Sequence, residues 1–104
     1  MKKFMIVDLD AHQGNGHERD HPDALKYYII DAYNHSIYPG DRVAKQFIQG
    51  DIDVHSHMSD EAFLQKVNNH VTRAIDAFQP EMVIYNAGTD CMVGDPLGCL
   101  SISE

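Results

Sequence analysis

The stretch that decides the fold is Phe4-Met5-Ile6-Val7, which runs directly into Asp8-Leu9-Asp10-Ala11-His12. Four consecutive apolar residues are typical of a strand buried on both faces of a parallel sheet. The strand predicted over residues 3–9 therefore delivers two carboxylates and an imidazole to its carboxyl end. Strand spacing places the Cα atoms of Asp10 and His12 about 6.6 Å apart with their side chains on one side, so both can reach one ion. Asp8 lies two residues before Asp10, so it is better placed to support the ligands from behind than to bind the ion as a third ligand.

A helix and two further strands are predicted around this strand. The helix covers residues 60–78, because Ser59 is a suitable N-cap and Pro80 ends the pattern. One apolar stripe at helical spacing runs along it, made of Phe63, Val67, Val71, Ala74 and Phe78. Residues 27–30 and 82–85 are rich in aromatic and branched apolar types and are predicted as buried strands.

The remaining segments are predicted as short elements and loops. Helical turns are expected within residues 17–25 and 41–48, and a weak strand at residues 52–55. Loops are expected at residues 11–16, 34–41 and 86–98, since each carries glycine among polar residues.

Strand, helix and strand in succession predict a right-handed parallel crossover and hence an α/β sheet. In such sheets ligands bind beyond the carboxyl ends of the strands. The loops that follow residues 3–9 and residues 82–85 both lie at that edge, which brings Asp10, His12 and Asp90 within reach of one another. Three protein ligands with one open position form the pattern of a catalytic zinc site. The residues alone leave open a plainer interpretation, in which these groups cap loops and turns.

Bulk composition limits the function classes. The chain has 104 residues, a formal net charge of −8 and no cluster of Lys and Arg. This argues against binding to nucleic acid or to an anionic membrane surface, and it is compatible with a cationic, lysine-bearing substrate. Cys91 and Cys99 lack metal-site spacing and fit a reducing compartment. With no apolar run of transmembrane length and no signal peptide, we expect a cytoplasmic protein, or a nuclear one in a eukaryote.

The remaining histidines are expected to face solvent. His17 and His21 lie four residues apart, and His55 and His57 alternate, but all four stand among polar residues. The lone His35 and His70 have the same expectation. The tyrosines at positions 27, 28 and 33 are predicted to be packing residues.

Two motifs resemble the histone deacetylase family. They are Val7–Gly16 and Tyr85–Asp90, the latter followed by Gly94-Asp95-Pro96-Leu97-Gly98. Gln13, His17-Glu18-Arg19-Asp20 and Ile37-Tyr38-Pro39-Gly40-Asp41 are most similar to its class IV branch. The resemblance covers essentially the whole chain, so residues 1–104 are interpreted as part of one catalytic domain. It implies the arginase/deacetylase α/β fold and zinc-dependent hydrolysis of acyl-lysine amides, in a protein or in a small acetylated amine.

The resemblance also implies roles for individual residues. Asp10, His12 and Asp90 would bind zinc, and Asp8 would steady a catalytic histidine. The main-chain carbonyls of Asp8, Asp10 and His12 would border a structural potassium ion, and Asp31 lies about where the family supplies further ligands to that ion. Gly88 would line the floor of the acyl channel.

The sequence departs from the family in its proton-transfer groups. It contains no His-His pair and no Gly-Gly-Tyr, and it resembles the central third of a family domain. We therefore expect the isolated chain to be inactive or weakly active. We also expect a bare sheet edge with apolar surface, and hence poor solubility or self-association.

Two alternatives stay open. One is a zinc-binding remnant without catalysis. The other is a phosphatase resembling the haloacid dehalogenases, with Asp8 as nucleophile, Asp10 as general acid and Asp90 or Asp95 on magnesium. That family expects Thr or Val at the position of His12 and a lysine in a later loop, whereas Lys66 lies within the predicted helix.

Overall fold

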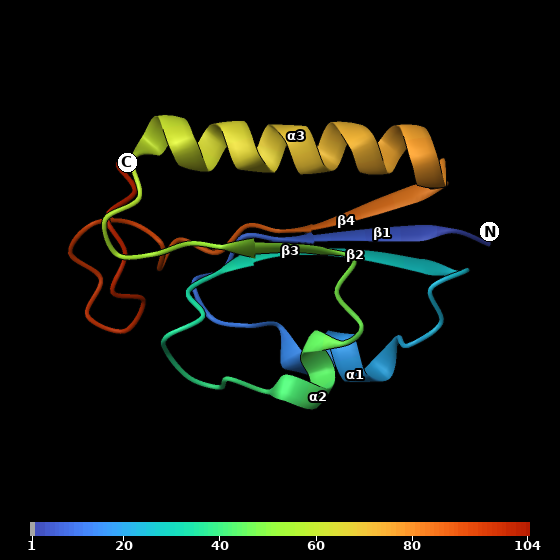
Figure 1. Ribbon diagram of the computed structural model, residues 1–104, viewed down its shortest axis with the longest axis horizontal. Helices are drawn as coiled ribbons and strands as arrows, with labels where there is room; N and C mark the ends of the chain where they lie inside the picture. Colours follow the sequence, from blue (N-terminus) through green and yellow to red (C-terminus); the bar gives the residue numbers. More distant parts are fainter. Residues whose placement is uncertain (1) are drawn as a thin grey trace.

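The computed structural model describes residues 2–104, which fold around a four-stranded sheet covered by helices on both faces (Figure 1). The strands follow the order β3-β2-β1-β4, and every neighbouring pair is parallel. The predicted α/β parallel sheet is therefore confirmed. In chain order the elements are β1 (Phe4–Asp8), α1 (Asn15–Asp20), β2 (Tyr27–Tyr33), α2 (Arg42–Lys45), β3 (Gly50–Asp53), α3 (Asp60–Phe78) and β4 (Met82–Asn86).

The layers follow from the alternation of side chains along the strands. Met5 and Val7 of β1 are buried together with Phe63 and Ala74 of α3 in the main core cluster. Because successive strand residues point to opposite faces, Asp8 lies on the other face, which α1 and α2 cover (Figure 1). The sheet thus separates an apolar core under α3 from a layer with buried polar groups under α1.

Helix α3 has the predicted bounds. The Ser59 side chain accepts a hydrogen bond from the Ala62 amide at 3.2 Å, and the Gln79 amide donates to the Ile75 carbonyl at 3.0 Å. Phe63, Ala74 and Phe78 are buried, and Val67 and Val71 pack against the core. The apolar stripe read from the sequence is thus the face that covers the sheet.

The bounds of several short elements differ from the prediction. β2 continues to Tyr33, because Ile30–Tyr33 pair in parallel with Gly50–Asp53 of β3. β3 starts two residues before the predicted strand, and the helix predicted over residues 41–48 is regular only in α2. In each case pairing and packing between distant segments set the boundary.

Strand β4 is exposed, so the prediction of a buried strand at residues 82–85 was wrong. It pairs with β1 along one edge only, and exposure rises from 42% at Met82 to 60% at Tyr85. Helix α3 packs mainly on β2 and β3, at the opposite side of the sheet, which leaves the apolar side chains of β4 uncovered. β1 is central as expected, and the bare apolar edge lies at β4.

The described residues include no helix that is both long and apolar enough to cross a lipid bilayer.

Candidate metal centre

Asp10, His12 and Asp90 meet at the carboxyl end of the sheet. The Nδ1 atom of His12 lies 2.7 Å from Asp90 Oδ2 and 3.3 Å from Asp10 Oδ1. Each residue offers a ligand atom within 4.8 Å of the other two. All three side chains are 20–35% exposed, so the cluster is open to solvent on one side. The structure therefore brings together the three residues that the sequence singled out.

The geometry arises from loops rather than from a continuous strand. β1 ends at Asp8, and the loop that follows is fixed by the Ala11 amide, which donates to Asp90 Oδ1 at 2.7 Å. The Asn34 amide donates to the Ala11 carbonyl at 2.9 Å, and its side chain donates to the Gly98 carbonyl at 3.2 Å. The expected strand spacing of Asp10 and His12 thus does not apply, although the two side chains still converge.

Gly88 lets the two loops approach. A Cβ atom at this position would lie 2.5 Å from the Cα atom of Asp10, closer than any side chain tolerates. The partly buried Gly88 therefore lies directly against Asp10.

The two carboxyl groups have different proton affinities. Burial raises the pKa of Asp10, and the neighbouring Asp90 adds to this effect. Burial also acts on Asp90, but hydrogen bonds from the Ala11 amide, His12 and Asp10 outweigh it and lower its pKa. One carboxylate is thus held ionised beside the imidazole, and a cation would favour ionisation of the second.

Asp8 supports this cluster from behind. Its side chain is 1% exposed, and Oδ1 accepts hydrogen bonds from the Asp10 amide and the Asn86 side chain, both at 3.0 Å. Asp8 therefore fixes the start of the loop that carries Asp10 and His12. Asn86, which the sequence reading did not single out, ties Asp8 to β4.

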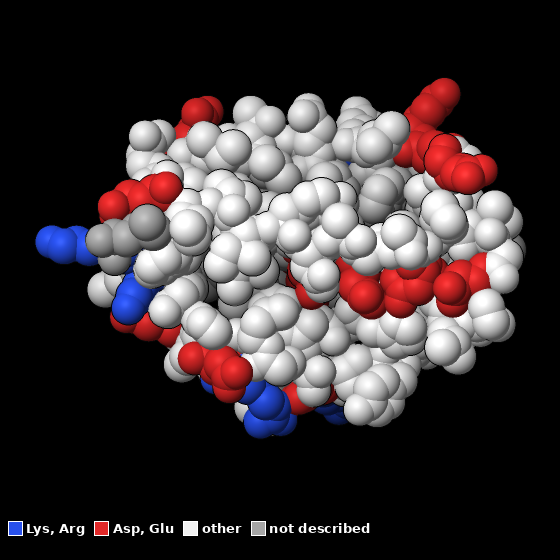
Figure 2. All heavy atoms as spheres, turned by 180° about the vertical axis from the view of Figure 1, so that it is seen from behind, with Lys and Arg blue, Asp and Glu red and all other residues white. Residues whose placement is uncertain are grey.

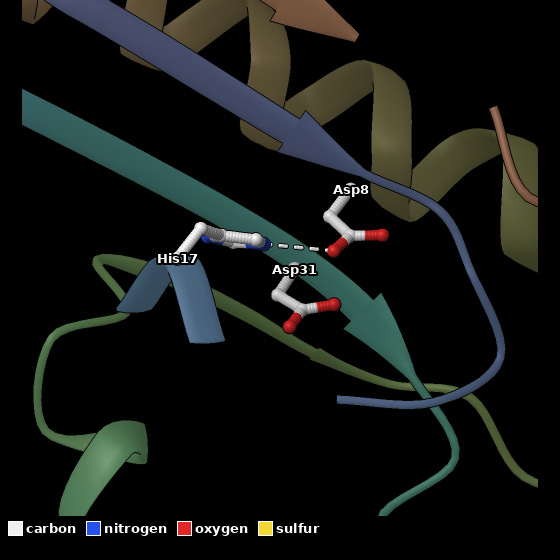
Figure 3. A group of neighbouring side chains, drawn as sticks. All are labelled: Asp8, His17 and Asp31. Atoms are coloured by element: carbon white, nitrogen blue, oxygen red, sulfur yellow. Dashed lines mark hydrogen bonds and ion pairs between the residues drawn. The ribbon is translucent and has the colours of Figure 1, made fainter. Parts of the chain in front are cut away.

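The prediction that His17 faces solvent was wrong. Its Nε2 atom lies 2.8 Å from Asp8 Oδ2, and the ring reaches from α1 toward the end of β1 (Figure 3). The reason is that α1 begins at Asn15, just after the Gly14 turn, and so folds back over Asp8. Asp31 stands opposite Asp8 in the parallel register of β1 and β2 and presents its carboxylate beside this pair.

A buried polar network surrounds a second group of potential ligands, formed by Asp8, His17 and Asp31. The Gln13 side chain donates to Glu18 Oε1 and to the Asp41 carbonyl, both at 2.9 Å, while its own carbonyl oxygen accepts from the Asp41 amide at 2.7 Å. Arg19 binds the Asp41 carboxylate through two nitrogens, which lowers the pKa of Asp41. These bonds join α1 to the start of α2 and hold Glu18, which is fully buried, beside Asp31.

The remaining histidines divide into exposed and paired ones. His55 and His57 are exposed as expected. His35, in contrast, pairs with Asp51 of β3 at 2.8 Å, and His21 packs edge-on against Tyr27. These contacts contradict the prediction of solvent-facing side chains. For His35 the reason is that β2 is longer than expected and carries its flanking residues onto β3.

A cavity lies beside α2, next to the polar network of Gln13 and Asp41. It has a volume of about 300 Å³ beside α2 and is lined by Gln13, Tyr33, His35, Gly40, Asp41, Arg42 and Lys45. None of the predicted site residues lines it, so we place the candidate site by its donor atoms and not by this cavity.

Fold and site together define an α/β protein with a carboxylate–histidine cluster at the carboxyl end of a parallel sheet. The family model for the histone deacetylase domain matches residues 1–104. Because the match covers the whole chain, the protein belongs to the histone deacetylase family.

Individual relatives agree with the family match. Histone deacetylase 2 of Arabidopsis thaliana is 50% identical over 103 residues, which cover 99% of this chain and 27% of that protein. Histone deacetylase 15 of the same plant is 28% identical over 113 residues, covering 98% of this chain and 20% of that protein. This chain thus spans about a quarter of the first relative and a fifth of the second.

Solved structures share the fold. The crystal structure of the HDA15 HD domain matches with a TM-score of 0.80 and 29% identity, over 97% of this chain and 33% of that chain. The structure of the histone deacetylase Clr3 matches with a TM-score of 0.80 over 98% of this chain and 19% of that chain, and at 23% identity it shows the fold alone.

The buried Asp31 carboxyl group should make the free energy of unfolding depend on pH. Burial raises its pKa to about 10, and hydrogen bonding with Glu18 and the charge of Asp8 act in the same direction. Between the ordinary value of 3.8 and about 10 the folded chain binds the extra proton, so its free energy of unfolding falls as the pH rises. In chelator-treated buffer, Asp31→Asn should flatten this decline in urea unfolding between about pH 5 and about pH 9.

The matched control is Asp76→Asn, on the exposed surface of α3, which should keep the slope of the unaltered chain. Equal slopes for the unaltered chain and Asp31→Asn would contradict the pKa of Asp31 given above.

Proposed function

We propose that this chain provides the metal-binding part of a zinc-dependent deacetylase that hydrolyses acyl-lysine amides. The observation that carries the proposal is the convergence of Asp10, His12 and Asp90 from two loops at one end of the sheet. Membership of the histone deacetylase family supports the reaction type. The comparisons give no support to the phosphatase alternative.

The donor set fits zinc. Two carboxylates and one imidazole, partly open to solvent, match a site with three protein ligands and one free position. When bound there, zinc would polarise the amide carbonyl and lower the pKa of a bound water toward about 7. Asp10, His12 and Asp90 would hold the ion, and Asp8 would keep the Asp10 loop in place through the Asp10 amide.

The charge distribution supports a lysine-bearing substrate. The chain carries 16 acidic residues against 8 Lys and Arg. Figure 2 shows acidic side chains gathered in a row across part of the face seen from behind, without Lys or Arg among them. Such a surface attracts a basic peptide around an acyl-lysine, and it also accepts a small acetylated amine. We place Gly88 at the floor of the acyl channel, because it lies against Asp10.

Assignment to class IV and to the cytoplasm or nucleus also belongs to this proposal. The class rests on Gln13 and on the segments around His17 and Tyr38. The location rests on two thiols without a disulfide, Cys91 and Cys99.

Zinc binding tests the ligand set. Asp10→Ala should lose one equivalent of bound Zn²⁺ relative to the unaltered chain, because two protein ligands hold the ion poorly. The stoichiometry is measured by calorimetric titration and by metal analysis after dialysis. His55→Ala removes an exposed histidine and should leave the stoichiometry unchanged. An unchanged stoichiometry in Asp10→Ala would remove these residues from the zinc site.

A turnover assay tests whether the isolated chain can hydrolyse an acyl-lysine amide. The 104 residues contain no His-His pair and no Gly-Gly-Tyr, so the isolated chain should hydrolyse an acetyl-lysine peptide little or not at all, even with zinc. Loss of acid–base groups typically lowers the catalytic rate about 10²–10⁴-fold, and loss of an oxyanion donor lowers it about 10²–10³-fold. Zinc binding without turnover would support the alternative in which the isolated chain is a zinc-binding remnant without catalysis. Robust, chelator-sensitive turnover would refute this account.

We further propose that the isolated chain self-associates through β4. This strand has an unpaired edge and four exposed apolar side chains, from Met82 to Tyr85. A charge on such an edge opposes pairing. Val83→Lys should therefore lower the sedimentation-derived mass toward that of the monomer, whereas Leu64→Lys on the exposed face of α3 should not. An unaltered chain that sediments as a monomer would contradict the proposal.

A further inference from the structure

Asn34 lies where the loops after β1, β2 and β4 meet. It follows Tyr33, the last residue of β2, and it is buried, with 4% of its surface exposed. Figure 1 shows these three loops gathered at the carboxyl end of the sheet, the end that holds the candidate zinc ligands. A buried side-chain amide needs partners for its NH₂ group and for its oxygen. The partners of Asn34 therefore indicate what it does.

The backbone of Asn34 binds the first of the two loops that carry candidate zinc ligands. Its amide donates to the Ala11 carbonyl at 2.9 Å. Ala11 is fully buried and stands between Asp10 and His12 in the chain. The amide of Ala11 donates in turn to Asp90 Oδ1 at 2.7 Å. The backbone that carries the first two ligands is thus held from two sides.

The side chain of Asn34 binds the second loop. Its Nδ2 atom donates to the Gly98 carbonyl at 3.2 Å, across 64 residues of sequence. Gly98 lies directly against Asp90, because a Cβ atom at Gly98 would collide with the Asp90 carbonyl oxygen. Asn34 therefore binds one loop at Ala11 and the other beside the ligand residue Asp90.

A local turn is the plainer explanation of an asparagine at the end of a strand. The Oδ1 atom of Asn34 accepts a hydrogen bond from the Ser36 amide at 3.0 Å, which is the pattern of an Asx turn. This turn uses the side-chain oxygen alone, so it does not require the bond from Nδ2 to Gly98. The two ends of the side chain have separate partners, and substitution can separate their roles.

We propose that Asn34 is a positioning residue for the zinc centre, which fixes the distance between the two loops that carry the ligands. The inference rests on the proposed function, because it takes Asp10, His12 and Asp90 as the ligands. Both polar ends of the Asn34 side chain are engaged, so it acts through the loops and not as a ligand. Replacing a residue that orients metal ligands from outside typically weakens metal binding about 10–100-fold.

Asn34→Asp separates the two roles of the side chain. The aspartate keeps an oxygen for the Ser36 amide but loses the donor to Gly98, so Zn²⁺ binding should weaken at least about 10-fold. The added negative charge alone would strengthen the binding of a cation, so it opposes the expected change. The affinity is measured by competition with a chelator. An affinity equal to or above that of the unaltered chain would overturn the proposal.

Two control variants separate positioning from charge and from stability. Asn69→Asp places the same charge on the exposed surface of α3 and should leave the Zn²⁺ affinity unchanged. Phe78→Leu reduces a buried side chain that packs on Tyr28 at the amino end of the sheet. It should lower the melting temperature and leave the Zn²⁺ affinity unchanged. Equal weakening of Zn²⁺ binding in Phe78→Leu and Asn34→Asp would overturn the proposal, because a loss of stability would then explain both.

Asn34→Ser is the second variant, used if far-UV circular dichroism shows that Asn34→Asp does not fold. A serine hydroxyl can accept from the Ser36 amide but is too short to replace the bond to Gly98. Asn34→Ser should therefore also weaken Zn²⁺ binding at least about 10-fold, and an unchanged affinity would contradict the proposal.

Hydrogen exchange without metal distinguishes this proposal from the proposed function. The buried Ala11 amide is bonded to Asp90, so it should be protected from exchange in the metal-free chain and should lose that protection in Asn34→Asp. Loss of protection in a chain that binds no zinc would refute the zinc centre and still support Asn34 as the residue that joins the loops. Unchanged protection of the Ala11 amide in Asn34→Asp would overturn the proposal even where zinc binds.

Discussion

Parallel pairing of β1 with β2 on one side and β4 on the other is the constraint on which both clusters depend. It places Asp8 opposite Asp31 and opposite Asn86 in register. Parallel strands end at the same edge of a sheet, so the loops after β1 and β4 must meet there. A shift of one residue in either pairing would turn these polar side chains to the other face and separate the ligands.

Burial of the sheet face that carries Asp8 and Asp31 has an unfavourable free energy, because it removes carboxyl groups from water. Both carboxyl groups lie at or below 1% exposure, and fully buried Glu18 lies beside them. An apolar layer would stabilise such a small fold more effectively, since burying carboxyl groups is costly, and burial accordingly raises the pKa of Asp31. The opposite face, under α3, is apolar throughout its main cluster and supplies the hydrophobic stabilisation.

Sequence patterns predicted the elements that have strong local signals. α3 has its cap at Ser59 and its apolar stripe within 19 residues, so its bounds could be read directly. The convergence of Asp10, His12 and Asp90 followed from parallel topology, although the strand spacing assumed for the first two residues does not occur. Errors arose where distant segments decide the outcome. β2 is extended by pairing with β3, and β4 is exposed because α3 packs mainly on the other strands.

By itself the sequence determined the fold class, the family resemblance and the three residues of the proposed zinc centre. These depend on local periodicity and on motifs in the loops that follow the strands. Only the tertiary structure decided the position of His17, because its polar neighbours give no sign that α1 folds back over Asp8. It also decided the burial of Glu18 and Asp31, since burial depends on what the rest of the chain packs against a residue and not on the residue itself.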